Sequence, residues 1–211
     1  MTSGGMARWS EFLFIFGVLP VAFRFRLIPL SPIPALWVVA IYCVYRLWSD
    51  PEFDRRKLWN AGAFPPQARP IFLLFAVCAL GVTVCVYFFG RPLLFNFVRR
   101  DPVFWALLML LYPMFSVYPQ GVVYRAFLFQ RYRELLPNRY ARIAVSAAAF
   151  SFVHIIFRNV IAVVLTLIGG VIFALRYAES DSLFTSALEH ALYGCWMFTV
   201  GLGDFFYKGA R

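Results

Sequence analysis

Four ionisable side chains, Arg125, His154, Glu189 and His190, lie within stretches of sequence that are otherwise apolar. An imidazole exchanges a proton near neutral pH, a guanidinium binds carboxylates and phosphates, and a carboxylate can activate water. At the centre of a membrane-spanning helix a charged side chain costs about 2.5–3.5 kcal/mol, so such groups usually face a bundle interior and mark a functional site. The alternative is a polar cluster that only holds helices together.

The composition places these residues in a membrane protein. The chain has 211 residues, of which 62% are hydrophobic, 20% aromatic and 14% charged, whereas soluble domains are about 45–50% apolar and about 25% charged. This excludes a soluble globule and a disordered chain, and the long continuous apolar blocks exclude a transmembrane β-barrel. We expect an all-α, polytopic membrane helix bundle of about six to seven transmembrane helices. It would form a single transmembrane domain over residues 1–211.

The apolar blocks predict the spans and their boundaries. The expected ranges are 9–25, 33–47, 70–89, 102–132, 142–157, 160–177 and 181–200. Pro70 is expected at the N-terminus of the third span, where its missing N–H has no cost. Pro113 and Pro119 are expected to kink or interrupt the fourth.

Arg125 has no acidic neighbour on its own helix. Gly121 is the residue one turn before it, where a carboxylate would stack directly on the guanidinium. Gln120 lies about 140° around the helix and makes a poor partner. Arg125 therefore needs an acid from another span, and the candidates are Glu189 and, near the start of the chain, Glu11.

The two histidines admit two kinds of chemistry. Phe150 precedes His154 by one turn, so its ring lies on the same helix face and can fix the imidazole rotamer. With Glu189 or Cys195, His154 and His190 are possible zinc ligands. Cys195 lies about 140° around the helix from His190, which argues against joint coordination. We expect no cofactor, with zinc as the alternative.

The segment 116–132 resembles the first motif of the CPBP family, the CAAX-protease and bacteriocin-processing intramembrane proteases, also called the abortive-infection family. Arg125 matches the arginine of motif one, Phe150 and His154 match motif two, and His190 matches the histidine of motif three. The resemblance covers roughly residues 70–207. It implies an intramembrane peptidase in which a motif-one glutamate and the histidines activate water, while a motif-three Asn and a histidine stabilise the oxyanion.

The chain departs from the family pattern at the two glutamates of motif one and at the Asn or Asp of motif three. The two glutamates of motif one fall on Gln120 and Gly121, and the Asn or Asp of motif three falls on Gly194 or Cys195. We expect either an endopeptidase-like protein with impaired hydrolysis or a non-catalytic relative that binds a peptide, a lipid or a membrane partner. The candidate catalytic residues are His154, His190, Arg125 and Glu189, and the candidate binding residues are Gln120, Gly121, Phe150 and Cys195.

The charge distribution bears on partners and orientation. The net charge is +10, and most basic residues flank apolar blocks, where they meet lipid headgroups rather than nucleic acid. We expect the lipid bilayer and a membrane-tethered peptide or protein as partners. The predicted location is multi-pass in a bacterial inner membrane with the N-terminus inside, because the helix ends on that side carry more Lys and Arg. Intramembrane charge also fits a transporter or channel, but no internal repeat supports one.

Overall fold

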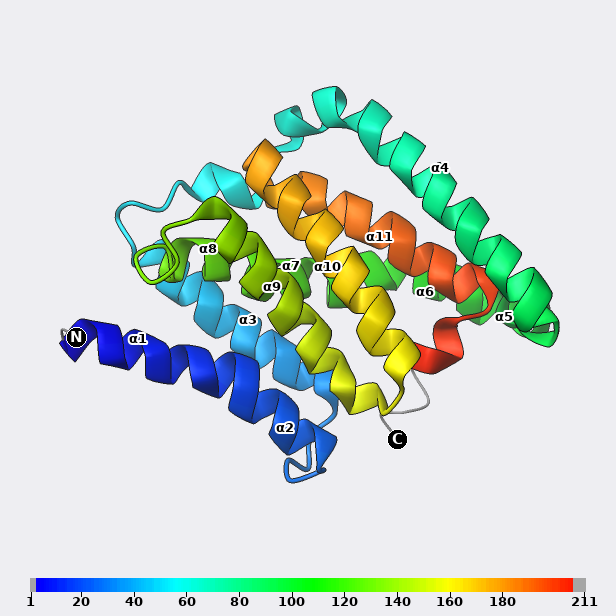
Figure 1. Ribbon diagram of the computed structural model, residues 1–211, viewed down its shortest axis with the longest axis horizontal. Helices are drawn as coiled ribbons and strands as arrows, with labels where there is room; N and C mark the ends of the chain where they lie inside the picture. Colours follow the sequence, from blue (N-terminus) through cyan, green and yellow to red (C-terminus); the bar gives the residue numbers. More distant parts are fainter. Residues whose placement is uncertain (1–2, 207–211) are drawn as a thin grey trace.

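The computed structural model describes residues 3–206, which form helices and connecting turns with no strand among them. This confirms the all-α bundle (Figure 1). The α-helices are α1 Ser3–Leu13, α2 Leu19–Arg24, α3 Pro32–Trp48, α4 Phe64–Phe89, α5 Asn96–Arg100, α6 Pro102–Tyr112, α7 Tyr118–Gly121, α8 Leu128–Arg131, α9 Arg139–Val153, α10 Val160–Ser180 and α11 Leu183–Val200.

Five helical segments in the described part of the chain are long and apolar enough to cross a membrane. They are Gly5–Arg24, Ala61–Phe89, Pro102–Arg131, Arg139–Phe157 and Val160–Ser180. The shorter apolar helix α3 and the helix α11 lie at the other two segments expected from the sequence, but neither is among these five. Large apolar side chains of α4, such as Leu73, Val77 and Phe88, are exposed on its outer surface, as contact with lipid requires.

The third span begins earlier than the sequence predicted. Helix α4 starts at Phe64, with Pro65 in its first turn, and Pro70 lies inside the helix. The first N–H groups of a helix have no intrahelical acceptor, so Pro65 occupies the position expected for Pro70 without loss of a hydrogen bond. The expectation that Pro70 starts the helix was therefore wrong.

The fourth span is a continuous helical segment that contains two π-helical stretches. Pro113–Val117 follows α6, and Val122–Phe127 lies between α7 and α8. Pro113 and Pro119 thus interrupt the α-helical hydrogen bonding without ending the helix, because wider turns accommodate their missing N–H groups. All six residues of the second stretch, including Arg125, are buried. Such π-helical turns occur frequently at functional sites.

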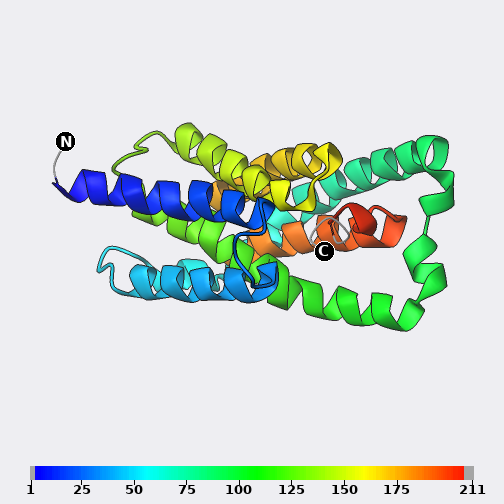
Figure 2. The ribbon, with the colours of Figure 1, turned by 90° about the horizontal axis from the view of Figure 1, so that it is seen from below.

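The second π-helical stretch lies at the centre of the bundle. Helix α3 packs against it, and α11 lies between α4 and α10, which in turn packs against α9. Figure 1 shows α4, α9, α10 and α11 running in roughly the same oblique direction across the molecule, and Figure 2 shows the bundle from below. The largest of the fully buried side chains is Arg125, at 1% exposure. A guanidinium therefore occupies the place that an apolar side chain usually takes.

Candidate functional site

Three of the predicted site residues meet around the ring of Phe150 in α9. The guanidinium carbon of Arg125 lies 4.8 Å from the centre of this ring. The centres of the His154 and His190 imidazoles lie 4.8 Å and 5.3 Å from it. All four residues are buried. The structure thus brings together side chains from the fourth segment, from the end of α9 and from α11.

Phe173 of α10 forms the second wall of this site. Its ring stacks on His190 with centres 4.5 Å apart and an angle of 22° between the planes. The guanidinium carbon of Arg125 lies 5.1 Å from the centre of the same ring. Each such cation–π contact contributes about 0.5–2 kcal/mol, more when water is excluded. Sequence reasoning missed Phe173, because nothing distinguishes one phenylalanine among 25 in an apolar chain.

The guanidinium of Arg125 has no hydrogen-bond acceptor within residues 3–206. Its Nε, Nη1 and Nη2 atoms are all buried and unpartnered. Two aromatic faces stabilise the charge in part, but they do not accept the five N–H groups of a guanidinium. A buried donor without an acceptor costs about 1–3 kcal/mol, and more when it is charged. A negatively charged hydrogen-bond acceptor at this site would therefore stabilise the buried guanidinium.

Gly121 explains why the acceptor is missing. A Cβ atom at this position would lie 3.6 Å from Nη1 of Arg125, so a carboxylate there would reach the guanidinium directly. Its Cβ would also approach Cδ1 of Leu183 to 2.7 Å. Leu183 is fully buried, and its side chain takes up part of the space that a residue larger than glycine would need.

Glu189 does not serve as the partner of Arg125, which corrects the expectation from the sequence. Its carboxylate accepts hydrogen bonds from Nε of Arg176 at 2.8 Å and from Nη2 of Arg176 at 3.4 Å. Arg176 in α10 also donates to Gln67 and to Glu179. Arg176 lies near the end of the predicted span 160–177, yet it is buried at 8% exposure. The carboxylate of Glu189 in α11 is therefore paired with Arg176 of the neighbouring helix α10.

The two imidazoles differ in their partners. Nδ1 of His154 lies 2.6 Å from the carbonyl oxygen of Phe150. A carbonyl only accepts, so Nδ1 carries the proton and Nε2 keeps a lone pair. Nε2 of His190 lies 3.5 Å from the hydroxyl of Tyr112, whereas its buried Nδ1 has no partner in the described structure. Tyr112, in α6, is a second site residue that the sequence analysis missed.

Gln120 and Cys195 have hydrogen-bond partners outside this cluster. Nε2 of Gln120 donates to Ser116 at 2.7 Å, and its Oε1 atom is buried without a partner. Sγ of Cys195 lies 4.0 Å from the carbonyl oxygen of Met109. No three His, Cys, Asp or Glu side chains among the residues described here come together in a way that could hold a metal ion. The side chains considered as zinc ligands therefore do not form such a group in the described structure.

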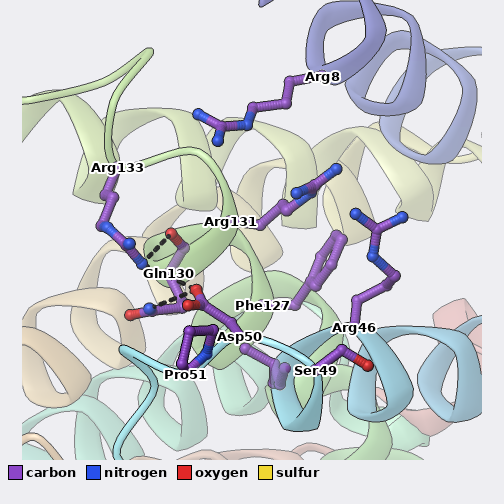
Figure 3. A pocket seen from close by; sticks show the side chains of 10 residues that line it. Arg8, Arg46, Ser49, Asp50, Pro51, Phe127, Gln130, Arg131 and Arg133 are labelled. Atoms are coloured by element: carbon purple, nitrogen blue, oxygen red, sulfur yellow. Dashed lines mark hydrogen bonds and ion pairs between the residues drawn. The ribbon is translucent and has the colours of Figure 1, made fainter. Parts of the chain in front are cut away.

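A pocket of about 240 Å³ lies elsewhere, at the end of the bundle that holds the start of α1. Figure 3 shows Arg8, Arg46, Arg131 and Arg133 around it. Their carboxylate partners are Glu134 for Arg8, Glu11 for Arg46 and Arg131, and Asp50 and Glu52 for Arg133. Each arginine is thus neutralised nearby, and the network ties α1, α3 and α8 together. Arg125, in contrast, has no carboxylate partner in the described structure.

Asp50 shows the effect of such pairing on a carboxyl group outside the spans. Partial burial acts to raise its pKa, but hydrogen bonds from Gln130, from the backbone N–H of Glu52 and from Arg133 outweigh it and lower the pKa. The charged form of Asp50 is therefore favoured in the folded protein. Above the ordinary pKa of an aspartate this group stabilises the fold, and its contribution falls as the pH drops through the lowered pKa.

The part of the chain that contains these residues matches a known family. Residues 102–196 match the profile of a family described as Rce1-like, type II CAAX prenyl endopeptidase Rce1-like. This segment is similar to that family. It contains Arg125, Phe150, His154 and His190, and the match confirms the resemblance to the CPBP proteases. Together with its long apolar helices, it identifies a multi-pass integral membrane protein. Comparisons with curated proteins and with solved structures gave no significant match.

Proposed function

We propose that this CAAX-protease-like protein binds the terminal carboxylate of a membrane-tethered peptide at Arg125 and does not hydrolyse the peptide. The observation that carries the proposal is the buried guanidinium whose three nitrogen atoms have no acceptor among residues 3–206. A carboxylate matches the fork of a guanidinium with two parallel hydrogen bonds. Binding would convert an unpaired buried charge into a paired one, which is the arrangement that proteins normally require.

The choice of a peptide follows from the family of the segment. The CAAX sequence in the family's description is a C-terminal motif, so a peptide that carries it ends in a carboxylate. Arg125 lies against the rings of both Phe150 and Phe173. These rings would exclude water from the bound carboxylate and strengthen its ion pair.

We expect no hydrolysis because the site that residues 3–206 form lacks an acidic side chain that could act on the histidines. Water attack on an amide needs a positioned base and a donor for the oxyanion. The family's acidic positions hold Gln120 and Gly121, and Glu189 is bound to Arg176. Within the described chain, no acidic side chain hydrogen-bonds to either histidine.

The second candidate function is the endopeptidase itself, favoured by one feature of His154. Its Nε2 atom keeps a lone pair, because Nδ1 donates to the carbonyl oxygen of Phe150. This atom could accept a proton from water. Without a carboxylate to orient the imidazole, we expect any such rate to be far below that of a complete site.

A binding measurement tests the proposal. The purified protein in lipid nanodiscs is titrated with a prenylated peptide that ends in a free carboxylate and with the same peptide as its C-terminal amide. We expect the free acid to bind at least about tenfold more tightly, which corresponds to about 1.4 kcal/mol. Arg125→Met should remove this difference, and the matched control Arg100→Met, on the exposed end of α5, should keep it.

Two results would overturn the proposal. Equal affinity of the wild-type protein for acid and amide would remove the role of Arg125. Tight binding of a long-chain fatty acid, with no binding of the peptide, would replace the peptide by a lipid carboxylate. Mass spectrometry of the same samples tests hydrolysis, and cleavage that is lost in His154→Ala would establish the endopeptidase instead.

The orientation of the chain belongs to the same proposal. We propose that the N-terminus faces the cytoplasm. The network of Arg8, Arg46, Arg131 and Arg133 gathers at the end of the bundle where α1 begins, and basic residues at span ends favour the cytoplasmic side. Single cysteines introduced at exposed loop positions of the protein can be labelled in intact cells with a reagent that does not cross the membrane. We expect cysteines near the start of α1 to be protected from this reagent, and their labelling would contradict the proposed orientation.

A further inference from the structure

Tyr112 occupies the space of a side chain that this protein lacks. A Cβ atom at Gly194 would collide with the hydroxyl end of the Tyr112 ring, whose Cζ atom would lie 2.6 Å away. Position 194 is one of the two positions where the polar side chain of motif three falls. A glycine there makes room for a hydroxyl that comes from α6, a different helix.

The same hydroxyl lies beside the imidazole of His190. It lies 3.5 Å from Nε2 of His190, and residues 3–206 offer it no other hydrogen-bond acceptor. Donation of the hydroxyl proton to Nε2 would give that proton an acceptor. A neutral imidazole that accepts at Nε2 carries its own proton at Nδ1. That Nδ1 atom is buried and unpartnered.

We infer that Tyr112 is a positioning residue that holds His190 as a donor through Nδ1, so that His190 and Arg125 together receive a ligand with oxygen acceptors only. The inference rests on the proposed function and specifies its ligand chemistry. Arg125 and His190 lie against the same two rings, Phe150 and Phe173. A carboxylate fits this set of donors, whereas an amide or an alcohol would place its own N–H or O–H against them.

Histidine spectroscopy tests the inference without a ligand. The chain contains two histidines, so labelling with ¹⁵N-histidine gives a spectrum of four ring nitrogens, which His154→Gln assigns. We expect His190 to show a protonated Nδ1 and an unprotonated Nε2. Tyr112→Phe should shift His190 towards a mixture of tautomers. The control Tyr124→Phe alters a buried ring that contacts Phe150 at 5.6 Å and should leave both histidines unchanged.

Gly194→Ala gives an independent test that keeps the tyrosine. Its methyl group would displace the hydroxyl of Tyr112, so the His190 tautomer should change as in Tyr112→Phe. In both variants the affinity for the free-acid peptide should fall by about two- to tenfold, the effect of one hydrogen bond. A protonated Nε2 in the wild-type protein, or an unchanged His190 spectrum in Tyr112→Phe, would overturn the inference.

The two proposals fail separately. If the His190 tautomer responds to Tyr112 while acid and amide peptides bind equally, the proposed function is wrong and the role of Tyr112 as a positioning residue stands. If the free acid binds more tightly but the His190 tautomer does not respond, carboxylate binding stands and the role of Tyr112 is wrong.

Discussion

Replacing Arg125 by methionine separates a binding site from a structural polar cluster. If Arg125 held the helices together, its removal would destabilise the protein, because its partners would lose a hydrogen bond. The guanidinium has no such partner in the described chain. We therefore predict that Arg125→Met stabilises the ligand-free protein, although it abolishes carboxylate binding.

The magnitude follows from two opposing terms. Removing a charge from the centre of a spanning segment gains about 2.5–3.5 kcal/mol. The variant loses cation–π contacts with Phe150 and Phe173, each worth about 1 kcal/mol. Methionine fills much of the volume with a flexible apolar chain. We predict that the free energy of unfolding rises by about 1 kcal/mol.

Arg176→Met is the matched comparison, since it makes the same substitution at another buried arginine. It would leave the carboxylate of Glu189 buried without its partner, and breaking a buried pair in this way costs about 3–5 kcal/mol. Reversible unfolding in mixed SDS micelles, followed by circular dichroism, measures both variants. A loss of 2 kcal/mol or more in Arg125→Met, similar to the loss in Arg176→Met, would refute the reasoning.

Three further predictions concern other positions. Gly121→Glu should pair with Arg125 and weaken binding of the free-acid peptide at least about tenfold in the nanodisc titration, whereas unchanged affinity would contradict the 3.6 Å approach. The stability difference between the wild type and Asp50→Asn should be full at neutral pH and should shrink below about pH 4, because the pKa of Asp50 is lowered on folding; a constant difference in unfolding experiments across pH would count against it. Asn159→Ala should lower the unfolding free energy by about 1 kcal/mol, since its Oδ1 atom accepts from the N–H of Ala162 at 2.7 Å at the start of α10, and a neutral result would show that this cap contributes nothing.

The helices were largely predictable, because their signal is local. Continuous apolar blocks indicated each spanning segment, and the polar loops between them gave approximate ends. The start of α4 was misplaced because Pro65 and Pro70 carry the same local signal, and only the packed structure shows which one lies in the first turn. The π-helical stretch around Arg125 could not be predicted, because its hydrogen-bond pattern depends on neighbouring helices.

The sequence allowed us to predict which residues form the site, but not which of their side chains pair with one another. The cost of charge in lipid singled out Arg125, His154 and His190, and the structure brings them around Phe150. The partner of Glu189 could not be predicted, because Arg176 resembles any arginine near a span end until α10 and α11 are packed.

The contribution of Tyr112 also required the folded structure. The space beside Gly194 that it fills lies between helices far apart in the sequence. In the sequence, Tyr112 is one of several aromatic residues inside the fourth span, and nothing local singles it out.

The position of a bound carboxylate tests the central claim most directly. A cryo-EM or crystal map of the wild-type protein with the free-acid peptide should place two carboxylate oxygens about 2.7–2.9 Å from nitrogens of Arg125, with Glu189 still bound to Arg176. A map in which Arg125 pairs with Glu189, or in which the peptide carboxylate binds elsewhere, would contradict the account.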